Sequence, residues 1–178
     1  MLFRSANGIV ASLITAFKVL LIVGTAAVAF TYGTGPWGYV TASGAGGLCE
    51  GVPASARSGL SGFSAAMVGA LWSYNGWFVA AQVGEEIRDP GHTLPRALIG
   101  STVLVIALYL LVNAAFYRVL SPVEVASVPE SASVAAVLLE RVLGRAGAAV
   151  TAAAMMLSTF GTLHSSLLTT SQIGRAHV

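Results

Sequence analysis

The sequence predicts an all-α, polytopic membrane protein with four transmembrane helices. Of the 178 residues, 56% are hydrophobic and only 9% are charged, and the mean hydropathy is +0.80. A soluble domain carries about 25% charged residues, so this composition excludes an ordinary soluble protein. The apolar residues are also gathered into long stretches, as membrane spans require.

The same composition excludes several functional classes. The charges are scattered and sum to +2, so no basic patch suggests that the chain binds nucleic acid. The single cysteine, Cys49, allows no internal disulfide and no cysteine-based metal cluster. No zinc-type or phosphate-binding spacing occurs, and we therefore expect no metal and no cofactor.

Four apolar stretches define the predicted helices. They span residues 9–30, 61–83, 97–119 and 147–170. Each stretch is close to the roughly 20 residues that cross a bilayer as a helix. Together they form one transmembrane domain over residues 1–171, in which a loop rich in glycine, serine and proline separates the first two spans.

The second stretch is broken near its middle. Ser73, Asn75 and Gly76 interrupt it, and Glu85 and Glu86 follow it. Asparagine and glycine are poor helix formers, and serine and asparagine side chains compete for backbone hydrogen bonds. Non-helical backbone at membrane depth is tolerated only where protein or a water-filled cavity covers it, so the break predicts a binding site. The alternative is a packing glycine between aromatic residues at the membrane interface.

Two connections separate the last three stretches. Residues 89–93 are predicted to form a tight loop, because Pro90 prevents continuation of the preceding helix. Thr93 is then placed to cap the next helix, with Pro95 in its first turn. Residues 121–144 join the third and fourth spans and are expected to include a short amphipathic helix at the membrane interface. Its pattern consists of Val134, Val137, Leu138, Arg141 and Val142.

Two ionisable residues lie inside the predicted spans. Lys18 follows Ile9 by nine residues, which places it about 14 Å into the first helix and close to the bilayer centre. A charge at this depth is costly and indicates function by default, whereas the alternative is a lysine that extends to a nearby interface. His164 lies within the fourth span, where a hydrogen bond to a neighbour is a simpler role than a proton relay.

Five motifs follow one another in a fixed order along the chain. They read WSYNGW, GEEIRDP, LPRAL, YLLVNAAFYRVLSP and LSTFGTLHSS. In this order they resemble the amino acid–polyamine–organocation permeases, in particular their L-type amino acid transporter-like branch. The resemblance implies a leucine-transporter-like fold, a 5+5 inverted repeat of helices, in which the four stretches are helices 5–8. The chain would then be a central fragment without the broken helix 1, which holds the other half of the substrate site.

The resemblance also implies a function and a set of site residues. The function is secondary active transport of amino acids across the cell (plasma) membrane by alternating access, without catalysis. The partners are an amino acid substrate, a proton or an exchanged amino acid, and the lipid bilayer. Lys18 would take the place of a sodium ion, either as the coupling group or as a fixed cation in an exchanger, with Ser158 and Thr159 beside it. The substrate would contact Trp72 as a gate and the backbone of Ser73, Tyr74, Asn75 and Gly76.

Other interpretations apply to parts of the chain. A complete four-helix membrane scaffold or assembly subunit without transport activity is the alternative from another functional class. The acidic residues Glu85 and Glu86 are expected to be solvated loop charges rather than a catalytic pair. Residues 172–178, QIGRAHV, resemble the in-frame translation of a sequencing adapter, and we predict that they are an adapter scar rather than part of the transmembrane domain.

Overall fold

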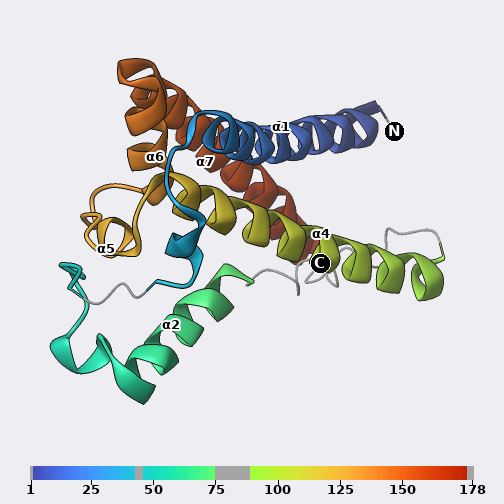
Figure 1. Ribbon diagram of the computed structural model, residues 1–178. Coiled ribbons are helices and arrows are strands. Elements are labelled where there is room, and N and C mark those ends of the chain that lie inside the picture. The colour runs from blue at the N-terminus through green and yellow to red at the C-terminus, as the bar shows by residue number, and fades with distance from the viewer. Residues whose placement is uncertain (1, 43–45, 75–88, 176–178) are drawn as a thin grey trace.

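Long helices make up most of the protein. The computed structural model describes residues 2–42, 46–74 and 89–175, with the backbone alone at 2–7, 164–165 and 167–175. Its three longest helices are α1 (Leu2–Tyr32), α4 (Pro90–Val119) and α7 (Arg145–Arg175). Helix α1 packs against both α4 and α7 (Figure 1). Helix α7 includes the first four residues of the 172–178 tail, whose origin stays a prediction.

Three segments in the described part of the chain are long and apolar enough to cross a membrane. They are Gly8–Tyr32, Pro90–Val119 and Arg145–Leu163, and they correspond to the first, third and fourth predicted stretches. Helix α2 (Gly59–Ser73) covers the start of the second stretch and has 15 residues. Its length of about 22 Å is less than the roughly 30 Å of a bilayer core. Residues 75–83 lie outside the described residues. The second predicted span, and with it the total of four transmembrane helices, therefore stays a prediction.

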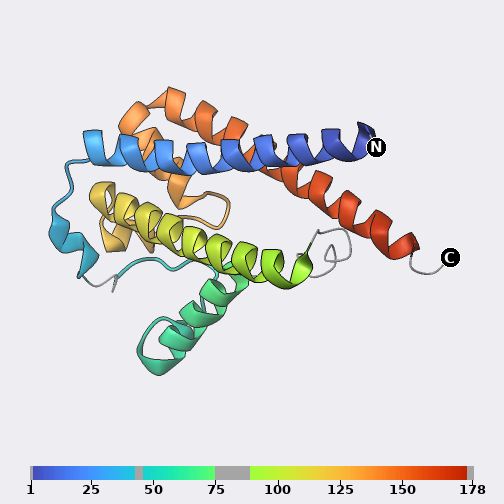
Figure 2. The same cartoon turned by 90° about the vertical axis from the view of Figure 1, so that its right-hand side faces the viewer.

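Helix α2 stands apart from the three long helices (Figure 2). It projects to one side, and its last turn lies near α4. Its surface carries large exposed side chains, including Leu60, Phe63 and Trp72. An apolar surface of this kind suits contact with lipid or with other helices rather than with water.

Helix α4 begins earlier than the sequence suggested. The predicted 89–93 loop ends at Asp89, and residues from Pro90 onward are already helical. The backbone N–H groups of His92 and Thr93 both donate to the carbonyl of Asp89, at 3.3 and 3.0 Å. Proline is well suited to the first position of a helix, because its missing N–H has no partner there. Thr93 is therefore not the cap, and Pro95 lies beyond the first turn.

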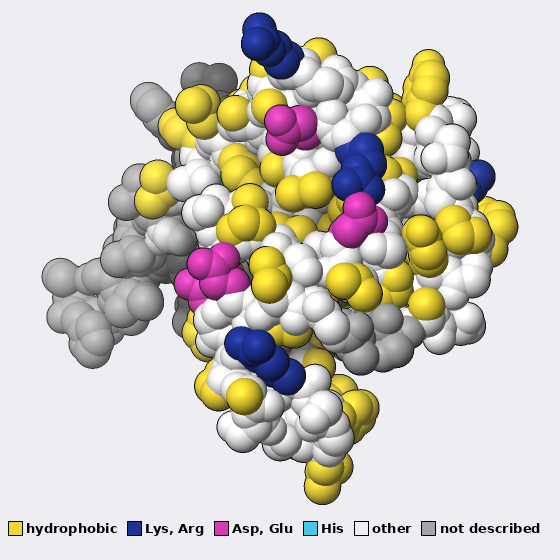
Figure 3. Space-filling view, turned by 60° about the vertical axis from the view of Figure 1, so that its left-hand side comes forward, with side chains coloured by type: hydrophobic (Ala, Val, Ile, Leu, Met, Phe, Trp, Pro, Cys, Tyr) yellow, Lys and Arg dark blue, Asp and Glu magenta, His cyan; other side chains and the backbone are white. Residues whose placement is uncertain are grey.

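The connection between α4 and α7 contains two short helices. Helix α5 is Pro122–Val125, and its start is fixed by a capping box in which Ser121 and Glu124 exchange backbone and side-chain hydrogen bonds. Helix α6 is Val134–Leu143, which confirms the predicted amphipathic helix. Figure 3 shows this end of the molecule, where acidic and basic side chains lie among apolar ones.

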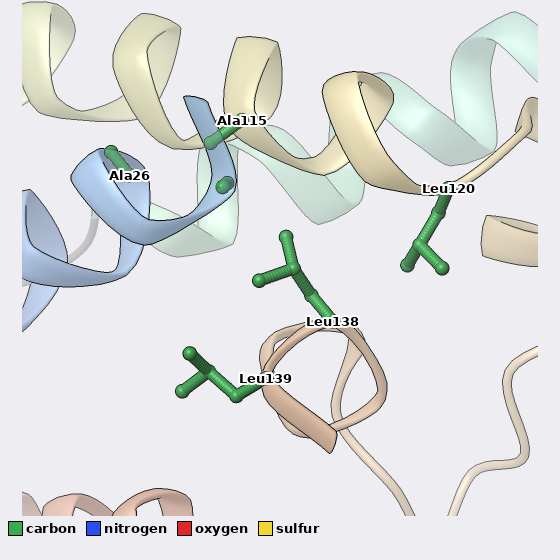
Figure 4. Close-up of a cluster of buried hydrophobic side chains, with 6 residues drawn as sticks. Ala26, Ala115, Leu120, Leu138 and Leu139 are labelled. Atoms are coloured by element: carbon green, nitrogen blue, oxygen red, sulfur yellow. The ribbon is translucent and has the colours of Figure 1, made fainter. Parts of the chain in front are cut away.

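The buried core joins α1, α4 and α6. Alanines from α1 and α4 meet there, and small residues of this kind let membrane helices approach closely. Leucines from α6 and from the end of α4 complete the cluster (Figure 4). The core residues are Ala26, Ala29, Ala115, Leu120, Leu138 and Leu139.

The loop that follows α1 is tied to the end of α4. The backbone N–H of Gly35 donates to the carbonyl of Arg118 at 3.0 Å, and the guanidinium of Arg118 donates back to the Gly35 carbonyl. The same guanidinium lies 5.3 Å from the ring centroid of Trp37, close enough for a cation–π contact. Further along, the backbone N–H of Cys49 donates to the carbonyl of Ala126 at 2.7 Å. The loop therefore follows the corner between α4 and α5.

Candidate substrate and coupling sites

Helix α2 ends inside the predicted second span. Its last residue is Ser73, and the backbone of Tyr74 leaves the helix with φ −94° and ψ 6°. The N–H of Tyr74 turns back to the carbonyl of Leu71 at 3.1 Å. The hydroxyl of Ser73 donates to the carbonyl of Gly69 at 3.3 Å, which is the local competition expected of serine. The helix thus stops where the sequence predicted a break.

A tyrosine on α4 meets the end of α2. The hydroxyl of Tyr109 donates to the carbonyl of Ser73 at 3.0 Å. The rings of Tyr109 and Tyr74 make an edge-to-face contact with centroids 5.3 Å apart. Sequence reasoning missed Tyr109, and the available signal was a hydroxyl inside an apolar stretch, which needs a partner when it is buried.

The remaining residues of the predicted substrate site are less constrained. Trp72, the predicted gate, has 77% of its surface exposed, so the described residues cover little of it. Asn75 and Gly76 lie outside the described residues, as do Glu85 and Glu86. The roles of all these residues stay predictions.

Lys18 lies in the middle of α1 and is half-buried. It lines a pocket of about 280 Å³ between α1, α4, α6 and α7. Ser158 lines the same pocket, so the structure brings these two predicted coupling residues together. Most of the other lining side chains are apolar, including Leu21, Leu139 and Val150.

The backbone of α7 comes close to the amine of Lys18. Gly161 is buried, and a Cβ atom at that position would lie 3.3 Å from both Cε and Nζ of Lys18. It would also lie 2.5 Å from Cγ2 of Ile14, which is too close for a real contact. A glycine is therefore what permits this approach of α1 to α7.

The other predicted coupling residue is oriented differently. Thr159 is exposed, and its hydroxyl donates to the carbonyl of Met155 within α7 at 2.9 Å. It does not line the Lys18 pocket. The backbone of His164 belongs to α7, but its side chain lies outside what the structure describes.

Charge is sparse around the Lys18 pocket. Among the residues that the structure describes, no carboxylate lies within 4 Å of the Lys18 amine, and no group of three potential metal ligands occurs. The Arg141–Glu124 ion pair, at 2.7 Å, lies in the α5–α6 connection instead. There the backbone N–H of Ser121 and then the Arg141 guanidinium hold the pKa of Glu124 below its ordinary value.

Comparison with known proteins gives a match to one protein family. The family profile described as "Amino acid permease" matches residues 2–176. The chain belongs to this family. The three apolar helices and the permease family together confirm a multi-pass protein of the cell membrane. They also confirm the resemblance to the amino acid–polyamine–organocation permeases and their L-type branch.

Curated relatives of this permease include transporters and an exchanger. The serine/threonine exchanger SteT of Bacillus subtilis (strain 168) is 35% identical over 107 residues, 60% of this chain and 24% of that protein. The large neutral amino acids transporter small subunit 2 of Homo sapiens is 36% identical over 102 residues, 57% of this chain and 18% of that protein. The b(0,+)-type amino acid transporter 1 of Oryctolagus cuniculus is 36% identical over 80 residues, 45% of this chain and 16% of that protein.

The chain therefore spans about a quarter or less of the length of these relatives. Their names describe transport and exchange rather than catalysis. No solved structure matches the chain.

Proposed function

We propose that this permease chain is the central part of a secondary amino acid transporter that works by alternating access. In this assignment α1, α4 and α7 are helices 5, 7 and 8 of the 5+5 repeat, and α2 is the first half of the broken helix 6. The motif order along the chain and the fraction of each relative that it spans support the assignment. The other half of the substrate site would come from a broken helix 1 elsewhere in the permease.

The observation that carries the proposal is the depth at which α2 ends. Tyr109, which contacts the last carbonyl of α2, lies about 7 Å from the midpoint of α4 at 1.5 Å per residue. Since α4 is itself long enough to cross a membrane, this contact supports an end of α2 near the bilayer midplane. Substrate sites of transporters lie at such broken helices.

The end of α2 has the chemistry to bind an amine. The last carbonyls of a helix carry the negative end of its dipole, and they favour a cation. The substrate ammonium would therefore bind the backbone carbonyls between Trp72 and Gly76. Trp72 would cover the substrate, and Asn75 would contact its side chain.

Lys18 would serve as the coupling group. Its position in the middle of a membrane helix, in a mainly apolar pocket with Ser158, supports a functional role for this lysine. Ser158 would bind the Lys18 amine, since both residues line this pocket. Thr159 is the less supported member of the set, because it is exposed and does not line this pocket.

Uptake measurements test the proposal. The permease that contains this segment would be reconstituted in liposomes and supplied with labelled L-serine or L-leucine under an inward proton gradient. We expect uptake by the wild type, and loss of gradient-driven uptake with retained exchange in Lys18→Gln. Lys18→Arg, which keeps the charge fixed, should behave like Lys18→Gln in the gradient assay. Unchanged pH dependence in both variants would remove the coupling role, and no uptake by the wild type would remove the transport function.

A further inference from the structure

Within the described part of the chain, Tyr109 of α4 contacts the end of α2. Its hydroxyl donates to the Ser73 carbonyl at 3.0 Å, and its ring meets the ring of Tyr74 edge-on, with an interplanar angle of 89°. The two residues joined by the hydrogen bond are 36 positions apart in the sequence. The contact therefore links two different helices rather than two turns of one helix.

The Ser73 carbonyl has the capacity to accept a second hydrogen bond. Carbonyls in the last turn of a helix accept no hydrogen bond from an N–H of the same helix, and Ser73 is the last residue of α2. A carbonyl oxygen has two lone pairs, and among the described residues the Tyr109 hydroxyl is the donor that uses one of them. A substrate ammonium can bind that remaining lone pair without displacing the tyrosine.

We propose that Tyr109 is a positioning residue for the substrate amine. Its hydroxyl fixes the direction of the Ser73 carbonyl, and its ring contact with Tyr74 fixes the hydroxyl. This role rests on the proposed function, because it requires that the end of α2 binds the amine of an amino acid. Preorganised acceptors bind a ligand more tightly, since less ordering remains to be done on binding.

Two substitutions separate the hydroxyl from the ring. Tyr109→Phe removes the hydrogen bond and keeps the edge-to-face contact, whereas Tyr109→Leu removes both. Tyr117→Phe is the matched control, because Tyr117 lies on the same helix and is half-buried. In the reconstituted permease, Tyr109→Phe should raise KM for L-serine or L-leucine about three- to tenfold, with kcat within about twofold of the wild type.

The kinetic pattern distinguishes positioning from a structural role. A residue that only holds α2 to α4 would lower the amount of active protein and leave KM unchanged. Unchanged KM in Tyr109→Phe, with uptake by the wild type, would overturn the inference and leave the proposed function intact. If the wild type takes up no amino acid, the proposed function fails and the positioning role fails with it.

The contact itself is open to a separate measurement on this chain. Ser73–Tyr74 is the only Ser–Tyr pair in the sequence. A chain labelled with ¹³C at serine carbonyls and ¹⁵N at tyrosine amides therefore gives a single signal that connects the two labels. Tyr109→Phe should move the Ser73 carbonyl resonance upfield, because a hydrogen bond is lost, and Tyr117→Phe should not. An unmoved resonance in Tyr109→Phe would overturn the inference whatever transport shows.

Discussion

Replacing Gly147 by alanine should force α6 and α7 apart. Gly147 is buried in the first turn of α7. A Cβ atom there would overlap the carbonyl group of Leu139 and lie 2.8 Å from the backbone nitrogen of Glu140. These are backbone atoms of α6, so a change of side-chain rotamer cannot relieve the overlap. One of the two helices has to move.

The size of the effect follows from two opposing terms. Overpacking of this kind costs about 1–3 kcal/mol, and movement of α6 would expose part of Leu139, whose full burial is worth about 1.5–3 kcal/mol. We take the combined cost as about 2–4 kcal/mol. Alanine in place of glycine in a helix returns at most about 1 kcal/mol. The expected net loss in the free energy of unfolding is therefore about 1–4 kcal/mol.

The same substitution elsewhere in the chain provides the control. A Cβ atom at Gly100, inside α4, would meet nothing within 4 Å. Gly100→Ala should therefore leave stability unchanged or raise it by up to about 1 kcal/mol. Unfolding of both variants in mixed detergent micelles, followed by far-UV circular dichroism, measures the difference. Equal stability of Gly147→Ala and the wild type, or the same change in both variants, would refute the reasoning.

Two further substitutions test the packing near Lys18 and the α5–α6 connection. Gly161→Ala should lower stability by about 1–2 kcal/mol in the same unfolding assay, because its Cβ would lie 2.5 Å from Ile14. Adding Ile14→Ala should offset much of the overlap cost, and additive losses in the double variant would contradict the contact. Glu124→Gln should reduce the sensitivity of α5 to acid. Because the folded-state pKa of Glu124 is lowered, its stabilisation is present above the unfolded-state value of about 4.5 and is lost as the pH falls through the lowered value. The effect should be about 1 kcal/mol or less at this exposed site, measured as amide exchange of residues 121–125 between pH 7 and pH 3. An equal acid response in the variant would count against it.

The positions of the long helices were predictable from sequence. Long apolar stretches report on the bilayer, which imposes its thickness on any helix that crosses it. The end of α2 was predictable for a local reason, since Ser73 and its neighbours disfavour helix through their own side chains and backbone. The amphipathic pattern around Leu138 identified α6 in the same way.

The contacts between helices were not predictable in this way. Tyr109 and Gly161 lie within apolar stretches, and neither hydropathy nor periodicity indicates which neighbour each one meets. The sequence placed the start of α4 too late because a proline is compatible both with the end of one helix and with the first position of the next. Pro90 was interpreted only as the residue that stops a preceding helix, whereas it is the first residue of α4. The shared pocket of Lys18 and Ser158 was expected from the family resemblance rather than from the residues themselves.

The hydrogen bonds that join the loop after α1 to the end of α4 and to the turn after α5 affect the order of folding. The partners Gly35 and Arg118 are 83 positions apart, and Leu48 and Ser127 are 79 apart. During synthesis the loop emerges before its partners exist, so these hydrogen bonds form only after α4 and α5 have been made. Closing such long loops costs chain entropy before any contact compensates for it. The corner between α4 and α5 is therefore expected to be a late step in assembly.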